Sequence, residues 1–284
     1  MTIVLDGRKA RDAYRTKLAL RVKALADQGT LPRLAIIQVG DNRESSIYIE
    51  QKKRFAASIG AAADHVRFAA DASQDTIAAK IGELNRTPEV HGIILQLPLP
   101  EGLDRLVLMN LIDPNKDVDG LTDENQKLLD RGEPRFVPAT AKGVMLLLDF
   151  YGIDVKGKPA AVFGRSRLVG YPIAQLLHIR GASSVSVIHS KTEDAALISR
   201  AADIVIVAMG KPELVDRSYI KDGAVVVDVG INSAAKNGKV VGDVRYADVA
   251  PITSAISPVP GGVGPMTVLS LFDNLILSAE RFSR

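Results

Sequence analysis

A tyrosine and a lysine stand four residues apart in a stretch with helical periodicity. On a helix over residues 46–60, Tyr48 and Lys52 share one face. A lysine can exchange a proton near neutral pH when burial or neighbouring charges lower its pKa. The pair is therefore a candidate for proton transfer. Lys53 and Arg54 follow directly, so a solvent-exposed charged helix face is the alternative interpretation.

An amide side chain follows a short buried strand. Residues 93–95 form an apolar run that is typical of a strand covered on both faces, and Gln96 comes next. Pro98 and Pro100 must end the strand close to Gln96, because proline has no amide hydrogen for a sheet ladder. The helix with the lysine follows an earlier strand over 34–40, so its first turns should lie at the edge where parallel strands end. We expect Gln96 to face a cleft at that same edge.

Two further stretches have the composition of a binding loop. Residues 114–120 (PNKDVDG) form a turn that carries Asp117 and Asp119, and the alternative is a surface turn with its own Asx hydrogen bonds. Residues 257–267 contain three glycines and three prolines before the last predicted helix. Such a constrained backbone indicates a rigid loop pressed close to a ligand.

A glycine-bearing turn joins a buried strand to a helix at residues 160–172. Gly164 ends the strand and Gly170 opens the helix, whose first amides can bind an anion. The spacing departs from G-x-G-x-x-G, because Ser166 takes the second glycine position and the last glycine falls one residue late. On this stretch alone, a phosphate-binding loop and a plain strand-to-helix turn both remain open.

The next strand bears on which dinucleotide would bind. Strands in this position of NAD-binding units usually end in Asp or Glu, which holds the ribose hydroxyls. Here the strand ends with Ser190 and Lys191 and no acid, while Arg165 stands in the glycine turn. Such groups suit a 2′-phosphate, so we predict NADP as the preferred cofactor. A later strand ends at residues 228–232, whose backbone can face the nicotinamide half of the cofactor.

These candidate residues lie in two series of alternating strands and helices. The order predicts an α/β fold with two parallel-sheet domains, because parallel strands need long crossovers between them. In the first series we predict helices over 7–29, 46–60 and 73–86 and strands over 34–40, 65–70 and 92–100. In the second, after a linking helix from about Ala141, we predict strands over 159–164, 184–190, 203–210 and 223–230, helices over 169–181 and 192–201, and a closing helix over 264–282.

Composition excludes several classes of protein and of site. The chain has 284 residues, enough for two domains, and its 46% hydrophobic and 24% charged residues are typical of a soluble globular protein. It has no cysteine, and its four histidines show no metal-ligand spacing, so we expect no disulfide and no metal site. The net charge is +3 with the basic residues spread along the chain, so we expect no nucleic-acid partner.

Asp6 interrupts the apolar core that a signal peptide needs, and no apolar run reaches membrane-spanning length, so we expect a cytoplasmic protein with no membrane partner.

Taken in order along the chain, these motifs carry a family resemblance. The sequence resembles the bifunctional methylenetetrahydrofolate dehydrogenase/methenyltetrahydrofolate cyclohydrolase family, called FolD in bacteria. The matching stretches extend over nearly the whole chain and are YIEQK, GIILQLPLP, PNKDVDG, VFGRSRLVGYP, HSKT, ADIVIVAMGKP, KDGAVVVDVGIN and PVPGGVGPMT. The resemblance implies a folate-binding catalytic domain over 1–139, completed by a helix over 265–284. It also implies a Rossmann-like NADP-binding domain over 140–264.

The resemblance further implies roles for individual residues. Lys52 corresponds to the catalytic lysine, with Tyr48 on its helix face and Gln96 as its hydrogen-bond partner. Asp119 corresponds to the carboxylate that holds the pterin ring. The implied cofactor contacts are Gly164, Arg165, Ser166, Ser190 and Ile231, and the further implied substrate contacts are Pro260, Gly261 and Gly262.

Two positions depart from the family pattern. Residues 137–141 read VPATA where the family usually has Pro-Cys-Thr-Pro, although Thr140 is kept. Ser257 stands where threonine is usual. We expect neither change to remove activity.

The implied activity has two steps. 5,10-Methylenetetrahydrofolate is oxidised to 5,10-methenyltetrahydrofolate by hydride transfer to NADP⁺, and water then opens the methenyl ring to give 10-formyltetrahydrofolate. The resemblance implies tetrahydrofolate one-carbon derivatives as substrates and a homodimer. Two alternatives stay open: an NADP-dependent dehydrogenase of another small acid, and a nucleotide-sensing binding protein without turnover.

Overall fold

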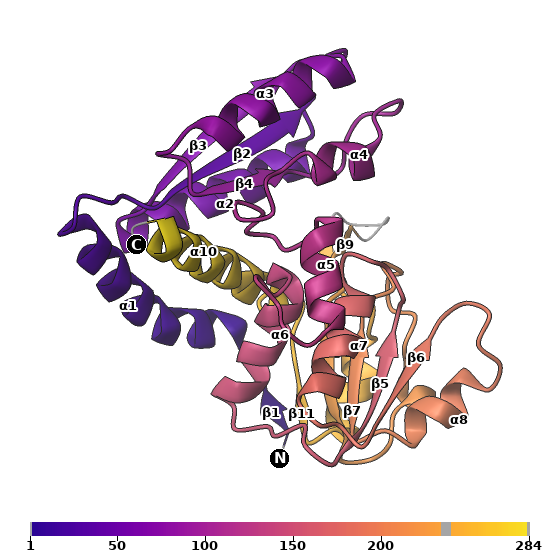
Figure 1. Ribbon diagram of the computed structural model, residues 1–284. Helices are drawn as coiled ribbons and strands as arrows, with labels where there is room; N and C mark the ends of the chain where they lie inside the picture. The colour runs from indigo at the N-terminus through magenta and orange to yellow at the C-terminus, as the bar shows by residue number, and fades with distance from the viewer. Residues whose placement is uncertain (1, 234–239, 283–284) are drawn as a thin grey trace. The chain divides into compact units, whose positions relative to one another are not determined.

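The computed structural model describes residues 2–233 and 240–282, and the chain divides into two compact units (Figure 1). One, here called the three-stranded unit, comprises Ala13–Ala139 and the chain from Val268 onward. The other, the six-stranded unit, comprises the chain up to Asp12 and Thr140–Thr267. Neighbouring strands are parallel in both of these sheets, so the predicted α/β fold with two parallel sheets is confirmed.

The three-stranded unit is built on a short parallel sheet. Its strands are β2 (Arg33–Val39), β3 (Ala62–Phe68) and β4 (Gly92–Leu95), in the order β3-β2-β4. Helix α2 (Arg43–Ile59) connects β2 to β3, and α3 (Gln74–Arg86) follows β3 on the way to β4. These two right-handed crossovers run in opposite directions along the sheet, so the helices cover opposite faces (Figure 1).

Local signals fix where α2 starts and ends. The side chain of Asn42 accepts a hydrogen bond from the amide of Ser45 at 2.8 Å, which satisfies one of the free amides in the first turn. Gly60 ends the helix with a φ of 80°, a left-handed conformation that glycine adopts without strain. Three residues separate the end of β2 from the start of α2, so the helix begins at the carboxyl edge of the sheet.

The last helix completes the three-stranded unit. In α10 (Val263–Phe282), the ring of Phe272 packs against an aromatic ring of α2. Asn274 is buried and donates its amide hydrogens to the carbonyl oxygens of Val118 and Val137, each at 2.9 Å. Because both amide hydrogens are hydrogen-bonded, burying this side chain carries little desolvation penalty, and the two bonds hold the helix in one register. The predicted return of the C-terminal helix to the first sheet is confirmed.

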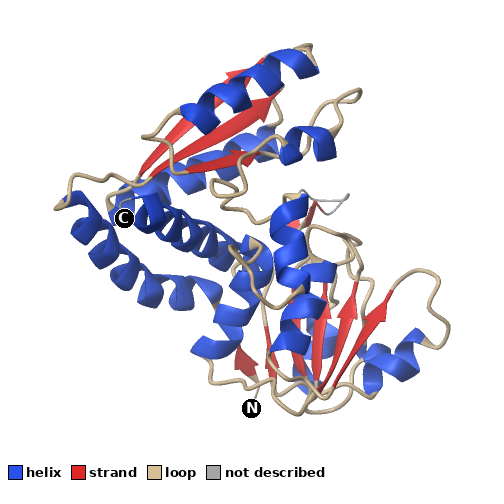
Figure 2. Ribbon diagram, viewed as in Figure 1, coloured by secondary structure: helices blue, strands red, loops and turns tan. Residues whose placement is uncertain are grey.

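The six-stranded unit has the sheet order β1-β11-β8-β7-β5-β6, and Figure 2 shows strands as red arrows. Its strands are β1 (Ile3–Val4), β5 (Pro159–Phe163), β6 (Ser184–Ile188), β7 (Ile204–Val207), β8 (Val225–Asp228) and β11 (Ala255–Ile256). Helix α7 (Gly170–Ile179) follows β5, and α8 (Ala195–Arg200) follows β6. The chain then crosses to the other side of β5, so the strand order reverses between β5 and β7, where doubly wound folds bind dinucleotides.

The remaining elements are short or connect the two sheets. They are α1 (Gly7–Ala26), α4 (Arg105–Asn110), α5 (Asp123–Asp130), α6 (Ala139–Phe150), α9 (Tyr246–Val249), the 3₁₀ turns η1 (Arg217–Tyr219) and η2 (Ala250–Ile252), and the antiparallel strands β9 (Asn232–Ser233) and β10 (Val240–Val241). Within the described part of the chain, no helix combines the length and the apolar character that crossing a membrane would require.

Several elements were not predicted from the sequence. Strands β1 and β11 add two neighbours to the second sheet, but two residues are too few to show an alternating pattern. No element was predicted for α4 or α5, which are six and eight residues long. Because β1 pairs with β11, the start of the chain lies in the six-stranded unit, whereas we expected residues 1–139 to form one domain.

Candidate active site

Lys52 and Gln96 are in direct contact. Nζ of Lys52 donates a hydrogen bond to Oε1 of Gln96 at 2.7 Å. Nε2 of Gln96 donates to the carbonyl oxygen of Leu97 at 2.9 Å, which turns the amide oxygen toward the lysine. The backbone amide of Gln96, the residue after β4, still donates to the carbonyl oxygen of Ile37 at 2.8 Å, so the sheet holds the backbone at this position. The structure therefore brings the helix lysine and the strand-end amide together.

Asp119 acts electrostatically on Lys52. Burial lowers the pKa of the Lys52 ammonium, and the negative charge of Asp119 partly offsets this effect. Burial raises the pKa of Asp119 to about 6, the positive charge of Lys52 opposes the increase, and Asp117 adds to it. Both groups therefore titrate closer to neutral pH than free side chains do, as groups that transfer protons or bind charged ligands often do.

The two carboxylates of the 114–120 turn have different surroundings. Asp117 is buried and accepts hydrogen bonds from the amide of Thr122 and the side chain of Asn125, both at 2.8 Å. It therefore organises the turn itself. Asp119 is half-buried, and no described residue donates a hydrogen bond to its carboxylate. Its oxygens are thus available to a ligand.

Tyr48 lies one turn before Lys52 in α2 and is half-buried. Burial raises the pKa of its hydroxyl, and the charge of Glu44 adds to the increase. The side chain is therefore a neutral phenol at physiological pH. It can donate a hydrogen bond and offer an aromatic face to a flat ligand ring.

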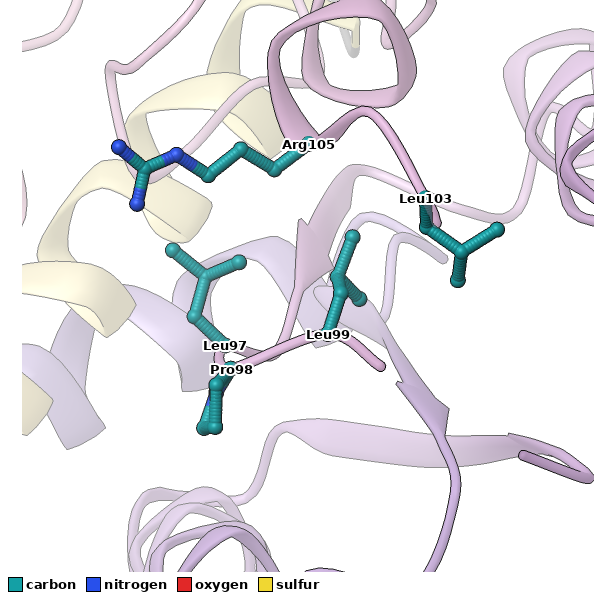
Figure 3. Close-up of a pocket in the computed structure, with 5 residues that line it drawn as sticks. All are labelled: Leu97, Pro98, Leu99, Leu103 and Arg105. Atoms are coloured by element: carbon teal, nitrogen blue, oxygen red, sulfur yellow. The ribbon is translucent and has the colours of Figure 1, made fainter. Parts of the chain in front are cut away.

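A pocket of about 400 Å³ opens in the segment that follows Gln96 (Figure 3). Its lining residues are Leu97, Pro98, Leu99, Leu103 and Arg105. Figure 3 shows the Arg105 side chain extending from the start of α4 on the side of Leu97. The pocket combines apolar walls with one guanidinium, and no sequence pattern predicted it.

The turn between β5 and α7 has no room for side chains at its two glycines. A Cβ at Gly164 would overlap the carbonyl oxygen of Ala208, and one at Gly170 would overlap the carbonyl oxygen of Gly164. Gly164 also has a φ of 108°, which favours glycine. Oγ of Ser166 accepts the amide hydrogens of Val169 and Gly170 at 3.3 and 3.4 Å. Where the strand meets the helix, the backbone therefore has no side chains at the two glycines and is held in one conformation by Ser166.

The predicted cofactor residues lie at one edge of the six-stranded sheet. Arg165 follows β5 and Ser190 follows β6, and these two strands are parallel neighbours. Both side chains are exposed. Ile231 follows β8 and is 49% exposed. Arg165 and Ser190 thus follow neighbouring strands at the carboxyl edge, and the exposed Ile231 follows β8, which is two strands from β5 and three from β6.

The loop over 257–262 is held tightly within the six-stranded unit. The amide of Gly7 donates to the carbonyl oxygen of Gly261 at 2.9 Å, and a Cβ at Gly7 would overlap the carbonyl oxygen of Gly262. Gly261 has a φ of 115°. Pro260 is exposed at the tip of this loop. The loop is therefore rigid, and its residues lie in a different unit from Lys52.

Two buried carboxylates were not among the predicted site residues. Asp228 ends β8, and Asp243 lies two residues after β10. A sequence signal was present, because each acid stands in an apolar run with a glycine one or two residues away (VVVDVG and VVGDV), where an unpaired charge is seldom tolerated. Among residues 2–233 and 240–282, no group of three or more His, Asp or Glu side chains is arranged to hold a metal ion.

Family models match both units of the chain. The model described as tetrahydrofolate dehydrogenase/cyclohydrolase, catalytic domain, matches residues 5–119. The model described as tetrahydrofolate dehydrogenase/cyclohydrolase, NAD(P)-binding domain, matches residues 138–283.

Individual relatives match over nearly the full length. The bifunctional protein FolD of Lacticaseibacillus paracasei is 43% identical over 281 residues, with 99% of each chain covered. The crystal structure of the bifunctional FolD methylenetetrahydrofolate dehydrogenase/cyclohydrolase from Campylobacter jejuni is similar with a TM-score of 0.96, 39% identity and 99% of each chain covered. The crystal structure of Trypanosoma brucei FolD, complexed with NADP cofactor and inhibitor, has a TM-score of 0.94 and 37% identity. It covers 99% of this chain and 98% of its own.

Proposed function

Since this chain belongs to the tetrahydrofolate dehydrogenase/cyclohydrolase family, we propose which of its residues carry the family's two reactions. The chain oxidises 5,10-methylenetetrahydrofolate to 5,10-methenyltetrahydrofolate with NADP⁺ and hydrolyses the product to 10-formyltetrahydrofolate. A dehydrogenase of another small acid and a binding protein without turnover are not favoured, because full-length relatives are bifunctional enzymes by name.

The β5–α7 turn fits a dinucleotide. Because a side chain at Gly164 or Gly170 would overlap backbone oxygens, the backbone is bare where a pyrophosphate has to approach it. Arg165 and Ser190 are the groups that would hold the 2′-phosphate, while Ser166 shapes the turn. Ile231 would contact the nicotinamide half. When bound, NADP⁺ accepts the hydride from the methylene carbon.

Asp119 is the group that would hold the folate. The pterin edge carries N–H donors, and the Asp119 carboxylate has oxygens to accept them. Tyr48 offers its ring face and its hydroxyl to the same substrate. The rigid loop with Pro260, Gly261 and Gly262 would supply further contacts to it.

The cyclohydrolase step needs a group that exchanges protons. As water adds to the methenyl carbon, a C–O bond forms and a proton leaves the water. The C–N5 bond then breaks as N5 gains a proton, and the hydroxyl on the same carbon releases its proton to solvent as the formyl C=O bond forms. The neutral amine of Lys52 can accept the first proton, and its ammonium can return one to N5. Gln96 holds Nζ of Lys52 in place through the 2.7 Å hydrogen bond, and this contact is the observation that carries the proposal.

One assay follows both reactions. Methylenetetrahydrofolate and NADP⁺ are mixed with the protein, and the absorbances of NADPH and of methenyltetrahydrofolate are recorded together. NADPH should appear while methenyltetrahydrofolate stays low, because the second reaction consumes it. A parallel sample with methenyltetrahydrofolate alone measures hydrolysis directly. Failure to form NADPH, or hydrolysis at the uncatalysed rate, would contradict the assignment of the corresponding activity.

The two units divide the substrates between them in this proposal. The three-stranded unit, with Lys52 and Asp119, is the folate-binding catalytic domain, and the six-stranded unit is the NADP-binding domain, with the main boundary near residue 140. The matches of the two family models, to residues 5–119 and 138–283, support this division. Equilibrium binding separates the two, because a change at Asp119 should alter only the folate affinity and a change at Arg165 only the NADP⁺ affinity.

A homodimer that forms through β6 is also proposed. β6 is an edge strand, so one side of its backbone is unpaired. Val187 of β6 is exposed, as are Ile179 of α7 and Leu197 of α8. Exposed apolar side chains on an open edge strand and on the helices that flank it suit self-association. Sedimentation should give twice the chain mass of 30.4 kDa, and the mass of a single chain at micromolar concentration would contradict it. Cell fractionation would test the expected cytoplasmic location.

A further inference from the structure

The buried pair Asp228 and Asp243 is not used by the mechanism above. Their exposed fractions are 3% and 0%. A carboxylate buried this deeply needs several hydrogen bonds to be tolerated. The partners of Asp243 are the amides of Met209, Gly210 and Lys211, at 2.6, 2.8 and 2.8 Å, and Nδ2 of Asn232 at 2.8 Å.

These four donors come from two separate loops. Residues 209–211 follow the carboxyl end of β7, and Asn232 follows the carboxyl end of β8. A single carboxylate therefore fastens both loops to each other at the carboxyl edge of the sheet. Each oxygen accepts two of the four hydrogen bonds, so neither loop can shift without leaving a buried oxygen or a donor unpaired.

Asp228 in turn holds the backbone around Asp243. It accepts hydrogen bonds from the amides of Gly230, Asp243 and Val244 at 2.9, 3.1 and 2.9 Å. The packing is close, since a Cβ at Gly242 would overlap the Asp228 carboxylate and one at Gly230 would overlap the Asp243 carboxylate. Burial raises the pKa of Asp228 to about 7, its three amide donors oppose the increase, and the charge of Asp243 adds to it.

The position of these loops connects them to the cofactor. In the sheet order β8-β7-β5-β6, the turn with Gly164 follows β5 and the 2′-phosphate residue Ser190 follows β6. A dinucleotide that lies across the reversal of strand order extends its other half over the ends of β7 and β8. Those ends carry the two loops that Asp243 fastens together.

We propose that Asp243 is a positioning residue for hydride transfer, which fixes the 209–211 and 231–232 loops under the nicotinamide half of NADP without touching the cofactor. This inference rests on the proposed NADP site. Hydride transfer needs donor and acceptor carbons in close alignment, and a misplacement of about 1 Å can cost on the order of 10²-fold in rate. Hydrolysis of the methenyl group needs no such alignment with a nicotinamide. The two activities should therefore respond differently when Asp243 is altered.

The test is Asp243→Asn, which keeps the size of the side chain but replaces one acceptor oxygen by an amino group. We expect the dehydrogenase kcat to fall roughly 10- to 100-fold while methenyltetrahydrofolate hydrolysis stays within about twofold of the parent. With substrate deuterated at the methylene carbon, the slowed reaction should show a full isotope effect, because hydride transfer has become the slow step.

The matched control is Asp216→Asn, since Asp216 lies in the same unit and caps η1 by accepting the amide of Ser218 at 2.9 Å. The control should leave both kcat values near those of the parent.

Asn232→Ala serves as a second variant, because it removes one of the four donors and leaves the buried acid in place. It should slow the dehydrogenase in the same direction by a smaller factor. Equal losses of both activities together with a lower unfolding temperature, or a slowed dehydrogenase without an isotope effect, would overturn the inference. So would an unaltered hydride-transfer rate in Asn232→Ala. A parent protein that fails to bind NADP⁺ in calorimetry would instead refute the cofactor site itself, so the two failures are distinguishable.

Discussion

At the level of single residues, Lys52 differs from its neighbour Lys53 although both lie in α2. Lys52 donates to Gln96, and burial lowers the pKa of its ammonium. Lys53 instead forms an exposed ion pair with Glu50 at 2.9 Å, an interaction of little energetic value. The two lysines therefore provide a matched pair for mutagenesis, with the same chemistry in different surroundings.

Lys52→Met should separate the two activities. Methionine keeps much of the packing but cannot exchange a proton, and a proton-transfer group is typically worth about 10²–10⁴-fold. Cyclohydrolase activity should be lost almost completely while some dehydrogenase activity remains, so methenyltetrahydrofolate accumulates alongside NADPH. Lys53→Met should behave like the parent. Hydrolysis of methenyltetrahydrofolate at the parental rate in Lys52→Met would show that this lysine transfers no proton.

Asp119 should make folate binding depend on pH. Its pKa is raised to about 6, so the carboxyl is charged above pH 6 and becomes neutral as the pH falls through 6. A neutral carboxyl accepts weaker hydrogen bonds, and the folate Kd of the parent should therefore rise below pH 6. Asp119→Asn should bind folate roughly 10- to 100-fold more weakly at pH 8, with no titration near 6 and with unchanged NADP⁺ affinity. Titrations followed by fluorescence at several pH values measure both constants. A parental folate Kd in the variant would make Asp119 a structural residue of its turn.

Arg165 should determine the choice between the two nicotinamide cofactors. Arg165→Ala removes a charge-assisted contact to the 2′-phosphate, which is worth on the order of 1.5–3 kcal/mol. The kcat/KM for NADP⁺ should fall accordingly while that for NAD⁺ hardly changes. Lys156→Ala, before the amino end of β5, is the control and should affect neither cofactor. Equal kcat/KM values for NADP⁺ and NAD⁺ in the unaltered protein would contradict the assignment.

At the level of elements, the sequence was informative where a pattern repeats and silent where the structure depends on residues far apart in the chain or on backbone groups. The buried runs of β2 and β4 and the amphipathic helices α2 and α3 were predicted, and these elements placed Lys52 and Gln96 at the same edge of the sheet. The hydrogen bond between the two side chains was implied only by the family resemblance. Strands β1 and β11 were not, because their pairing depends on residues about 250 positions apart in the chain. The Asp228 and Asp243 network was missed for a related reason, since its donors are backbone amides that no side-chain pattern reveals.

The β5–α7 turn can be tested by comparing two glycines that both have a positive φ. Gly164 and Gly157 have φ values of 108° and 73°, but a Cβ at Gly157 would meet nothing within 4 Å. Gly157→Ala should therefore cost about 1 kcal/mol, from backbone strain alone. Gly164→Ala should cost about 1–3 kcal/mol more, because the Cβ overlaps the Ala208 oxygen, and it should weaken NADP⁺ binding as well. Thermal unfolding and calorimetry measure the two effects. Equal losses of stability in the two variants would show that crowding at Gly164 is unimportant.

At the level of the whole molecule, one buried and one half-buried acid bind protons more readily in the native state than in the unfolded chain. The pKa of Asp228 is raised to about 7 and that of Asp119 to about 6, against about 4 for an aspartate in an unfolded chain. Between pH 4 and pH 7 these two groups therefore hold more protons in the native state. Their contribution to the free energy of unfolding falls as the pH rises through this window, and it is complete only below about pH 4.

Asp228→Asn should remove most of this pH dependence from the six-stranded unit. The unfolding temperature of the variant minus that of the parent should increase as the pH is taken from 5 to 8. The reason is that only the parent must bury a charge at the higher pH. Calorimetric scans at matched ionic strength measure this difference. A difference that stays constant over the range would contradict the raised pKa of Asp228.

The pairing of β1 with β11 also sets an order of events during synthesis. β1 is made about 250 residues before β11, the strand that it pairs with in the sheet. At 5–20 residues per second, this delay is roughly 10–50 s. During that time β1 lacks this partner, and β8 lacks its outer neighbour. The rest of the six-stranded sheet can assemble as it emerges, but its edge closes only after Ile256 has emerged. A nascent chain stalled before Ala255 should therefore keep its first residues open to protease, while one released after Ile256 should protect them.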